Sequence, residues 1–141
     1  MSPNSEQEIS HLLDQAVEAG KHALAPYSNF NVGAALEDEL GEIWTGCNIE
    51  SSSFGLTICA ERVALVKALS EGVRSFKRIV IAASGENITP PCGACLQLLN
   101  DYAPEIEVVL YNPDSAQTRK YNLSDLLPHP FKFTDYNKNV E

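Results

Sequence analysis

The stretch that decides the fold is residues 77–83, Lys-Arg-Ile-Val-Ile-Ala-Ala. Its centre, Ile79-Val80-Ile81-Ala82, is apolar on both faces of an extended chain. A strand of this kind is buried on both sides, as in the middle of a sheet that carries helices on its two faces. The stretch therefore predicts the central strand of an α/β layered domain.

The segments around this strand alternate between helical and extended patterns. Residues 5–24, 58–70 and 93–101 have the apolar spacing of helices. Short apolar runs predict four further strands, with a polar turn at residues 37–41 between the first two and a helical turn at residues 124–127. These four strands lie at residues 31–36, 42–47, 107–111 and 118–121. The order α-β-β-α-β-α-β-β places helices on both faces of a sheet.

The composition indicates one ordinary globular domain. The chain has 141 residues, of which 44% are hydrophobic and 21% charged. No linker, repeat or low-complexity stretch divides it, so we predict a single domain over residues 1–141. The polar tail, residues 134–141, is expected to be flexible or ordered by a neighbouring subunit.

The charge of the chain disfavours several classes of partner. The formal net charge is −9, which opposes binding to nucleic acid and to anionic membranes. There is no apolar run of about 18 residues that could span a bilayer, and residues 1–9 lack the apolar core of a signal peptide. We therefore expect a cytoplasmic protein with no nucleic-acid or membrane partner, whose reduced cysteines serve in metal binding or catalysis.

Three of the four cysteines lie in two motifs at predicted helix starts, Cys59-Ala60-Glu61 and Pro91-Cys92-Gly93-Ala94-Cys95. A helix N-terminus favours the thiolate form of cysteine. Three thiolates are soft ligands that bind zinc and leave a fourth position for a water molecule, as a catalytic zinc requires. Glu61 is suited to move protons beside that position as general acid and base.

Three further stretches follow the same pattern along the chain: Phe30-Asn31-Val32-Gly33-Ala34-Ala35-Leu36, Gly46-Cys47-Asn48-Ile49-Glu50 and Leu126-Leu127-Pro128-His129-Pro130-Phe131. Together the five motifs resemble those of the small cytidine deaminases, over about residues 25–131. The resemblance implies a three-layer α/β/α fold with a mixed five-stranded sheet. It also implies a homotetramer with shared active sites and one zinc ion per subunit.

The resemblance implies a role for each matched residue. Cys59, Cys92 and Cys95 hold the zinc, and Glu61 is the proton shuttle. The implied substrate contacts are Phe30 at the base, the Ala60 amide and the carbonyl neighbourhood of Ser52 at the pyrimidine, Asn48 with Glu50 at the ribose 3′-hydroxyl, and Phe131 in the site of a neighbouring subunit. Tyr27 and Phe54 are expected near the pocket.

The chain departs from the family at Leu96, where an arginine usually follows the last cysteine. Three thiolates around one Zn²⁺ leave an excess negative charge, which a guanidinium offsets through hydrogen bonds to sulfur. Because Leu96 cannot do this, we predict that Arg62 carries most of the charge compensation.

The residues near the motifs favour an unphosphorylated substrate. There is no glycine-rich phosphate loop and no basic cluster among them, and Glu50 beside the sugar would repel a phosphate. We therefore predict the zinc-dependent hydrolysis of cytidine or deoxycytidine to uridine or deoxyuridine and ammonia, in pyrimidine salvage.

Three other interpretations stay open at the level of the sequence. A deaminase of another aminopyrimidine nucleoside, such as blasticidin S, would have the same zinc centre. A structural zinc site could use Cys47 together with Cys59, Cys92 and Cys95. The Cys92-x-x-Cys95 pair alone could be a thioredoxin-like redox pair.

Overall fold

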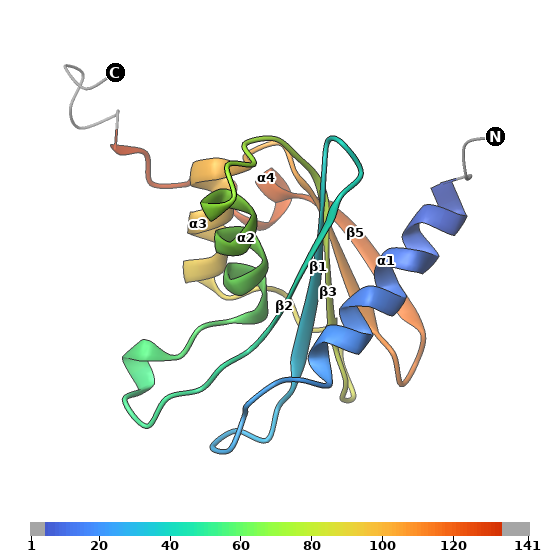
Figure 1. The fold of residues 1–141 in the computed structure, drawn as a ribbon, viewed down its shortest axis with the longest axis vertical. Coiled ribbons are helices and arrows are strands. Elements are labelled where there is room, and N and C mark those ends of the chain that lie inside the picture. Colours follow the sequence, from blue (N-terminus) through green and yellow to red (C-terminus); the bar gives the residue numbers. More distant parts are fainter. Residues whose placement is uncertain (1–4, 134–141) are drawn as a thin grey trace.

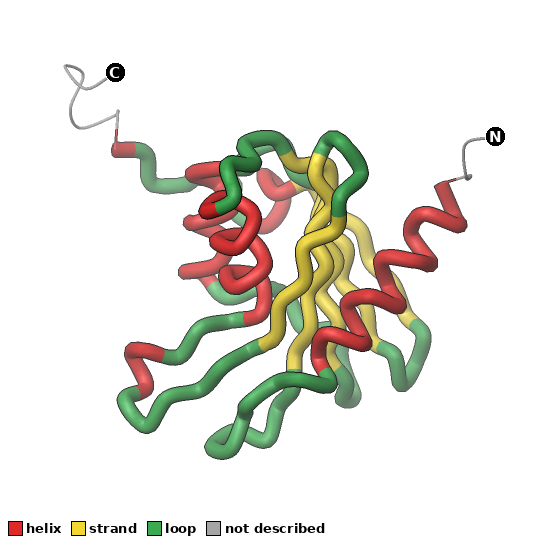
Figure 2. The backbone as a smooth tube through the Cα atoms, in the orientation of Figure 1, coloured by secondary structure: helices red, strands yellow, loops and turns green. Residues whose placement is uncertain are grey.

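Five strands form one mixed sheet in the order β2-β1-β3-β4-β5 in the computed structural model, which describes residues 5–133 (Figures 1 and 2). Strand β1 runs antiparallel to β2 and β3, β3 runs parallel to β4, and β5 runs antiparallel to β4. In chain order the elements are α1 (Ser5–Gly20), β1 (Val32–Asp38), β2 (Ile43–Cys47), the 3-10 turn η1 (Phe54–Leu56), α2 (Ala60–Ser70), β3 (Phe76–Ala83), α3 (Gly93–Tyr102), β4 (Glu107–Asn112), β5 (Gln117–Asn122) and α4 (Leu123–Leu126).

Strand β3 lies at the centre of the sheet, as residues 77–83 predict. Successive side chains of a strand point to opposite faces, and both faces of β3 are covered. Ile79 and Ile81 pack in the core beneath α2 and α3, whereas Val80 and Ala82 pack in the core beneath α1. Figure 1 shows α1 on one side of the sheet and α2 and α3 on the other. The predicted three-layer α/β/α fold with a mixed five-stranded sheet is confirmed.

Helix α1 ends at Gly20, so the prediction that it continues to Leu24 is wrong. Residues 21–23 form tight turns instead, in which the backbone N–H of Lys21 donates a hydrogen bond to the Glu18 carbonyl. Leu24 then pairs with Ile49 in an isolated parallel bridge. The apolar spacing extends past Gly20, but a glycine at this place favours the end of a helix.

The turn predicted at residues 37–41 begins later, because strand β1 continues through Asp38. Glu37 and Asp38 are both buried. The Asp38 carboxylate accepts hydrogen bonds from the backbone N–H groups of Leu40 and Glu42 and from the indole N–H of Trp44. These hydrogen bonds replace the water molecules that the buried carboxylate has lost. A polar stretch of sequence does not reveal that its side chains will be buried in this way.

Within residues 5–133 there is no helix with the length and apolar character needed to cross a membrane. The tail predicted at residues 134–141 lies outside the described residues.

Candidate metal centre and substrate cavity

The N-termini of α2 and α3 bring three cysteines together. Cys59 is the N-cap residue of α2, Cys92 is the N-cap residue of α3, and Cys95 lies in the first turn of α3. Their sulfur atoms all lie within 4.8 Å of one another. The Cys59 and Cys92 Sγ atoms are 3.8 Å apart, and those of Cys92 and Cys95 are 3.4 Å apart. In the described structure neither N-cap sulfur bonds the amides of its own helix, so both face the shared centre.

The three sulfur atoms fit a zinc ion. Tetrahedral coordination with Zn–S bonds of about 2.3 Å places sulfur ligands about 3.8 Å apart, which matches the Cys59–Cys92 separation of 3.8 Å. The sulfur atoms lie at the N-termini of two helices, where the helix dipole favours thiolates. Cys47, on β2, is not part of this group in the described residues. The geometry thus gives three protein ligands, not the four of a structural Cys₄ site.

The pKa values of two of the cysteines, Cys59 and Cys95, depend on each other. A hydrogen bond with the Cys95 thiol is the largest influence that lowers the pKa of Cys59, and Arg62 lowers this pKa further. The same bond raises the pKa of Cys95, as does burial. Cys59 is therefore the first of the two to become a thiolate, the form in which cysteine binds metal.

Arg62 is directed at the metal centre. Its Nη2 donates to the Cys59 sulfur at 3.7 Å and to the Thr57 carbonyl at 3.1 Å. Its buried Nε has no hydrogen-bond partner among the described residues. Leu96, in contrast, packs in the core with Ala64 and Leu99. Position 96 thus contributes an apolar contact and no charge to the candidate metal centre.

Glu61 lies beside the cysteines in the first turn of α2, and only 4% of the residue is exposed. It lines the same cavity as Cys59 and Cys92. Burial raises the pKa of its carboxyl group. A carboxyl whose pKa is shifted toward neutrality can both accept and return a proton, which is the property of a general acid and base.

Cys59, Glu61 and Cys92 open onto one cavity of about 320 Å³. This volume is typical of small-molecule sites. Seven residues predicted for the site line it: Phe30, Asn48, Glu50, Cys59, Ala60, Glu61 and Cys92. Six further residues complete the wall: Ser28, Val32, Thr57, Ile81, Thr89 and Pro90. The sequence does not single out these six, although Thr89 and Pro90 directly precede the second cysteine motif.

Asn48 and Glu50 also hold the cavity wall in place. The Asn48 amide donates to the Phe30 carbonyl at 2.8 Å and accepts the Val32 N–H at 2.9 Å. The Glu50 carboxylate accepts the N–H groups of Tyr27 and Ser28 and the Ser28 hydroxyl. These bonds with Ser28 lower the pKa of Glu50, so the carboxylate stays charged.

Four other residues expected at or near the pocket do not line the cavity. Ser52 is exposed in the loop between β2 and α2. Tyr27 and Phe54 stack edge to face, with ring centroids 5.8 Å apart, and both are exposed. Phe131 is 55% exposed, and its carbonyl accepts a hydrogen bond from Gln97.

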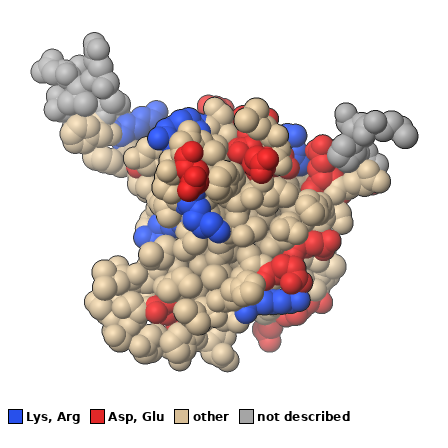
Figure 3. All heavy atoms as spheres, in the orientation of Figure 1, with Lys and Arg blue, Asp and Glu red and all other residues tan. Residues whose placement is uncertain are grey.

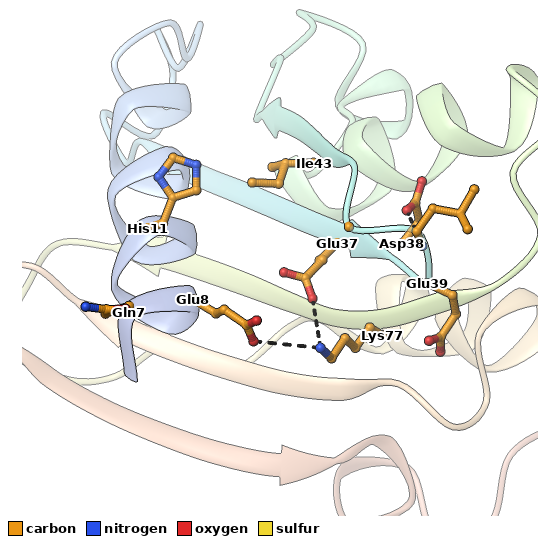
Figure 4. A pocket seen from close by; sticks show the side chains of 10 residues that line it. Gln7, Glu8, His11, Glu37, Asp38, Glu39, Ile43 and Lys77 are labelled. Atoms are coloured by element: carbon orange, nitrogen blue, oxygen red, sulfur yellow. Dashed lines mark hydrogen bonds and ion pairs between the residues drawn. The ribbon is translucent and has the colours of Figure 1, made fainter. Parts of the chain in front are cut away.

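A second hollow, of about 590 Å³, lies between α1 and the turn that joins β1 to β2 (Figure 4). Three of its charged side chains are paired with one another, since Lys77 lies 3.8 Å from Glu8 and 3.6 Å from Glu37. It has no cysteine among its lining residues. Of the two, the first cavity is therefore the one that combines candidate metal ligands with a candidate acid and base.

The chain is similar to known proteins over most of its length. The family model of the cytidine and deoxycytidylate deaminase zinc-binding region matches residues 6–111. A cytidine deaminase of Halalkalibacterium halodurans is 41% identical over 126 residues, which are 89% of this chain and 96% of that protein. The crystal structure of a cytidine deaminase from Burkholderia pseudomallei superposes with a TM-score of 0.83 at 42% identity and covers 86% of this chain and 98% of its own.

The blasticidin-S deaminase of Bacillus cereus is more distant, at 33% identity over 106 residues, which are 70% of this chain and 74% of that protein. The match of the family model covers both helix N-termini and all three cysteines. The chain belongs to the cytidine and deoxycytidylate deaminase family.

Proposed function

We propose that this chain is a cytidine deaminase that hydrolyses cytidine and deoxycytidine to uridine and deoxyuridine. The observation that carries the proposal is that Glu61 and two members of the three-cysteine group, Cys59 and Cys92, line one nucleoside-sized cavity. We further propose that the enzyme is a single domain over residues 1–141 that acts in the cytoplasm, in pyrimidine salvage.

Cys59, Cys92 and Cys95 would hold the zinc, which would supply an activated water molecule for addition to C4 of the pyrimidine ring. Glu61 takes a proton from this water and delivers it to ring N3. It then carries the second proton to the exocyclic nitrogen, and the C4–N bond breaks to release ammonia. The buried position of Glu61 supports this role, since a raised pKa makes its carboxylate a stronger base toward the water molecule.

The cavity wall supplies the proposed contacts to the nucleoside. Phe30 lies against the base, and the Ala60 N–H and the carbonyl neighbourhood of Ser52 bond the pyrimidine. The Asn48 amide uses one donor and one acceptor on the backbone, which leaves a second donor and lone pair for the ribose 3′-hydroxyl. The charged Glu50 carboxylate accepts a hydroxyl hydrogen and opposes a phosphate.

The proposal is tested by the loss of cytidine absorbance on incubation with the purified protein, alongside a zinc assay. We expect turnover of cytidine and deoxycytidine, its loss after chelation and its return with added zinc. Cytidine monophosphate is the control substrate and is expected to react poorly. A folded protein with one zinc per chain that leaves both nucleosides unchanged would contradict the proposal.

Arg62 is proposed to compensate the charge of the zinc thiolates, supported by its hydrogen bond to Cys59. We expect the change Arg62→Ala to lower kcat about tenfold and to reduce zinc content, because a charge-assisted bond to the thiolate is lost. Arg119→Ala, which removes the same charge from the exposed strand β5, is the control. Zinc content and kcat both equal to those of the parent enzyme would refute this role.

We also propose a homotetramer with shared active sites. The segments beside the cavity expose seven large apolar side chains: Leu24, Tyr27, Phe30, Ile49, Phe54, Leu56 and Ile58. The lower left of Figure 3, where residues 49–58 lie, is almost bare of charged side chains. An apolar surface of this kind is typical of an interface, and Phe131 from a second subunit is proposed to reach the cavity there.

This arrangement predicts complementation between two inactive variants. Glu61→Gln lacks the proton shuttle but supplies Phe131, whereas Phe131→Ala lacks the aromatic ring but supplies Glu61. Mixed oligomers formed by refolding both together are expected to recover activity that neither variant has alone. A mass of about four chains in sedimentation is expected for each variant. No recovery in verified mixed tetramers would contradict shared sites.

A further inference from the structure

Asn112, at the end of β4, joins two loops from inside the protein. Its side chain is fully buried, with 0% exposed. Its Nδ2 donates to the carbonyl of Gly85 at 2.8 Å and to that of Asn87 at 3.4 Å. Its Oδ1 accepts the N–H groups of Asp114 and Ser115 in the turn between β4 and β5. One amide therefore ties the β3–α3 loop to the β4–β5 turn.

Gly85 is held from both sides by this arrangement. Its carbonyl bonds Asn112, and its N–H donates to the Asp114 carboxylate at 3.1 Å. Its φ of +128° lies in a region that side chains disfavour. Farther along the loop, Ile88 packs against the core. The start of the loop thus has one defined path.

The same loop supplies part of the proposed substrate cavity. Thr89 and Pro90 line the cavity, two and three residues beyond Asn87. Pro90 restricts the backbone of Thr89, and Pro91 restricts that of Pro90, so Thr89 and Pro90 move together when the preceding part of the loop shifts. Cys92 has a separate anchor, because it is the N-cap of α3 and its carbonyl accepts the Leu96 N–H at 3.0 Å.

We propose that Asn112 and Asp114 are positioning residues for the substrate. They act through residues 85–88 to hold Thr89 and Pro90 at the cavity, while the metal ligands are held by α2 and α3. This inference rests on the proposed function, since it assigns Thr89 and Pro90 to the nucleoside-binding wall. It predicts that weakening these bonds impairs substrate binding more than chemistry or zinc binding.

Two variants test the hydrogen bonds of Asn112 and of Asp114 to the β3–α3 loop one at a time. Asn112→Asp keeps the acceptor for the Asp114 and Ser115 amides but loses the donor to Gly85 and Asn87. Asp114→Ala removes the acceptor for the Gly85 N–H from an exposed side chain, so its fold is expected to survive. Asp14→Ala removes the same charge from the exposed face of α1 and is the control.

We expect KM for cytidine to rise about tenfold in Asn112→Asp and about threefold in Asp114→Ala, with kcat changed less than about twofold. Zinc content stays at that of the parent enzyme. Hydrogen exchange of residues 84–91 becomes faster in both variants, whereas exchange in α1 does not change. If Asn112→Asp does not fold, Asp114→Ala decides.

An unchanged KM in Asp114→Ala would overturn the inference, even if its thermal midpoint fell, because stability alone indicates a purely structural role. Unchanged hydrogen exchange of residues 84–91 would overturn it as well. Failure of the proposed function has a different signature: the parent enzyme itself does not turn over cytidine, while hydrogen exchange still reports on the loop.

Discussion

The change Glu61→Gln is expected to lower kcat/KM for cytidine by about 10²–10⁴-fold, the usual contribution of a general acid and base. Glutamine matches glutamate in size, so the packing at this position, where 4% of the residue is exposed, is preserved. It is also uncharged, so the substitution removes the carboxylate base and leaves the volume of the side chain. What it cannot do is accept a proton from water and return it. We therefore expect activity to fall while zinc content and the thermal midpoint remain those of the parent.

The measurements are a cytidine absorbance assay, the zinc content per chain and a thermal unfolding curve on the same preparation. Glu71→Gln is a matched control, since Glu71 is exposed at the opposite end of α2. A variant that keeps zinc and more than about a tenth of the parental kcat/KM would exclude Glu61 as the proton shuttle. Loss of zinc together with activity would instead give Glu61 a role in holding the metal centre.

The candidate metal centre was predictable because one part of it has a local cause and the other follows from the topology of the sheet. Cys92 and Cys95 are three residues apart at a helix start, so one turn of helix brings their sulfur atoms together. Cys59 comes from 33 residues earlier, and its approach depends on how α2 and α3 share one face of the sheet. The connection from β3 through α3 to the parallel strand β4 leaves few arrangements for these helices.

The cavity wall was less predictable, because it depends on contacts between distant segments. Thr57 and Thr89 have no local pattern that distinguishes them from other loop residues, and only the fold brings both to the cavity. Glu37 shows the same limit in the sheet, where its burial depends on Lys77 and Arg78 of the neighbouring strand. Short-range patterns predicted the elements and the ligands, whereas the walls follow from the assembled sheet.

The close approach of β2 to α2 depends on Gly46, and Gly46→Ala is expected to disrupt it. A Cβ atom at this position would lie 2.5 Å from the Ala60 carbonyl oxygen and 2.6 Å from the Ala64 nitrogen. Both are backbone atoms of α2 and cannot rotate away, so the helix or the strand must move. Overpacking of this kind destabilises a fold by about 3 kcal/mol, which corresponds to a fall of about 10 °C in the thermal midpoint.

The displaced part of α2 is its first two turns, which begin at Cys59 and carry Glu61. Zinc affinity and activity are therefore expected to fall along with stability, as measured by thermal unfolding and by zinc retained against a competing chelator. Gly55→Ala is the control, because nothing lies within 4 Å of a Cβ atom there, and its unfolding free energy should change by less than about 0.5 kcal/mol. Parental stability and zinc affinity in Gly46→Ala would show that the metal centre tolerates movement of α2, so that its geometry is set by α3 and the ion itself.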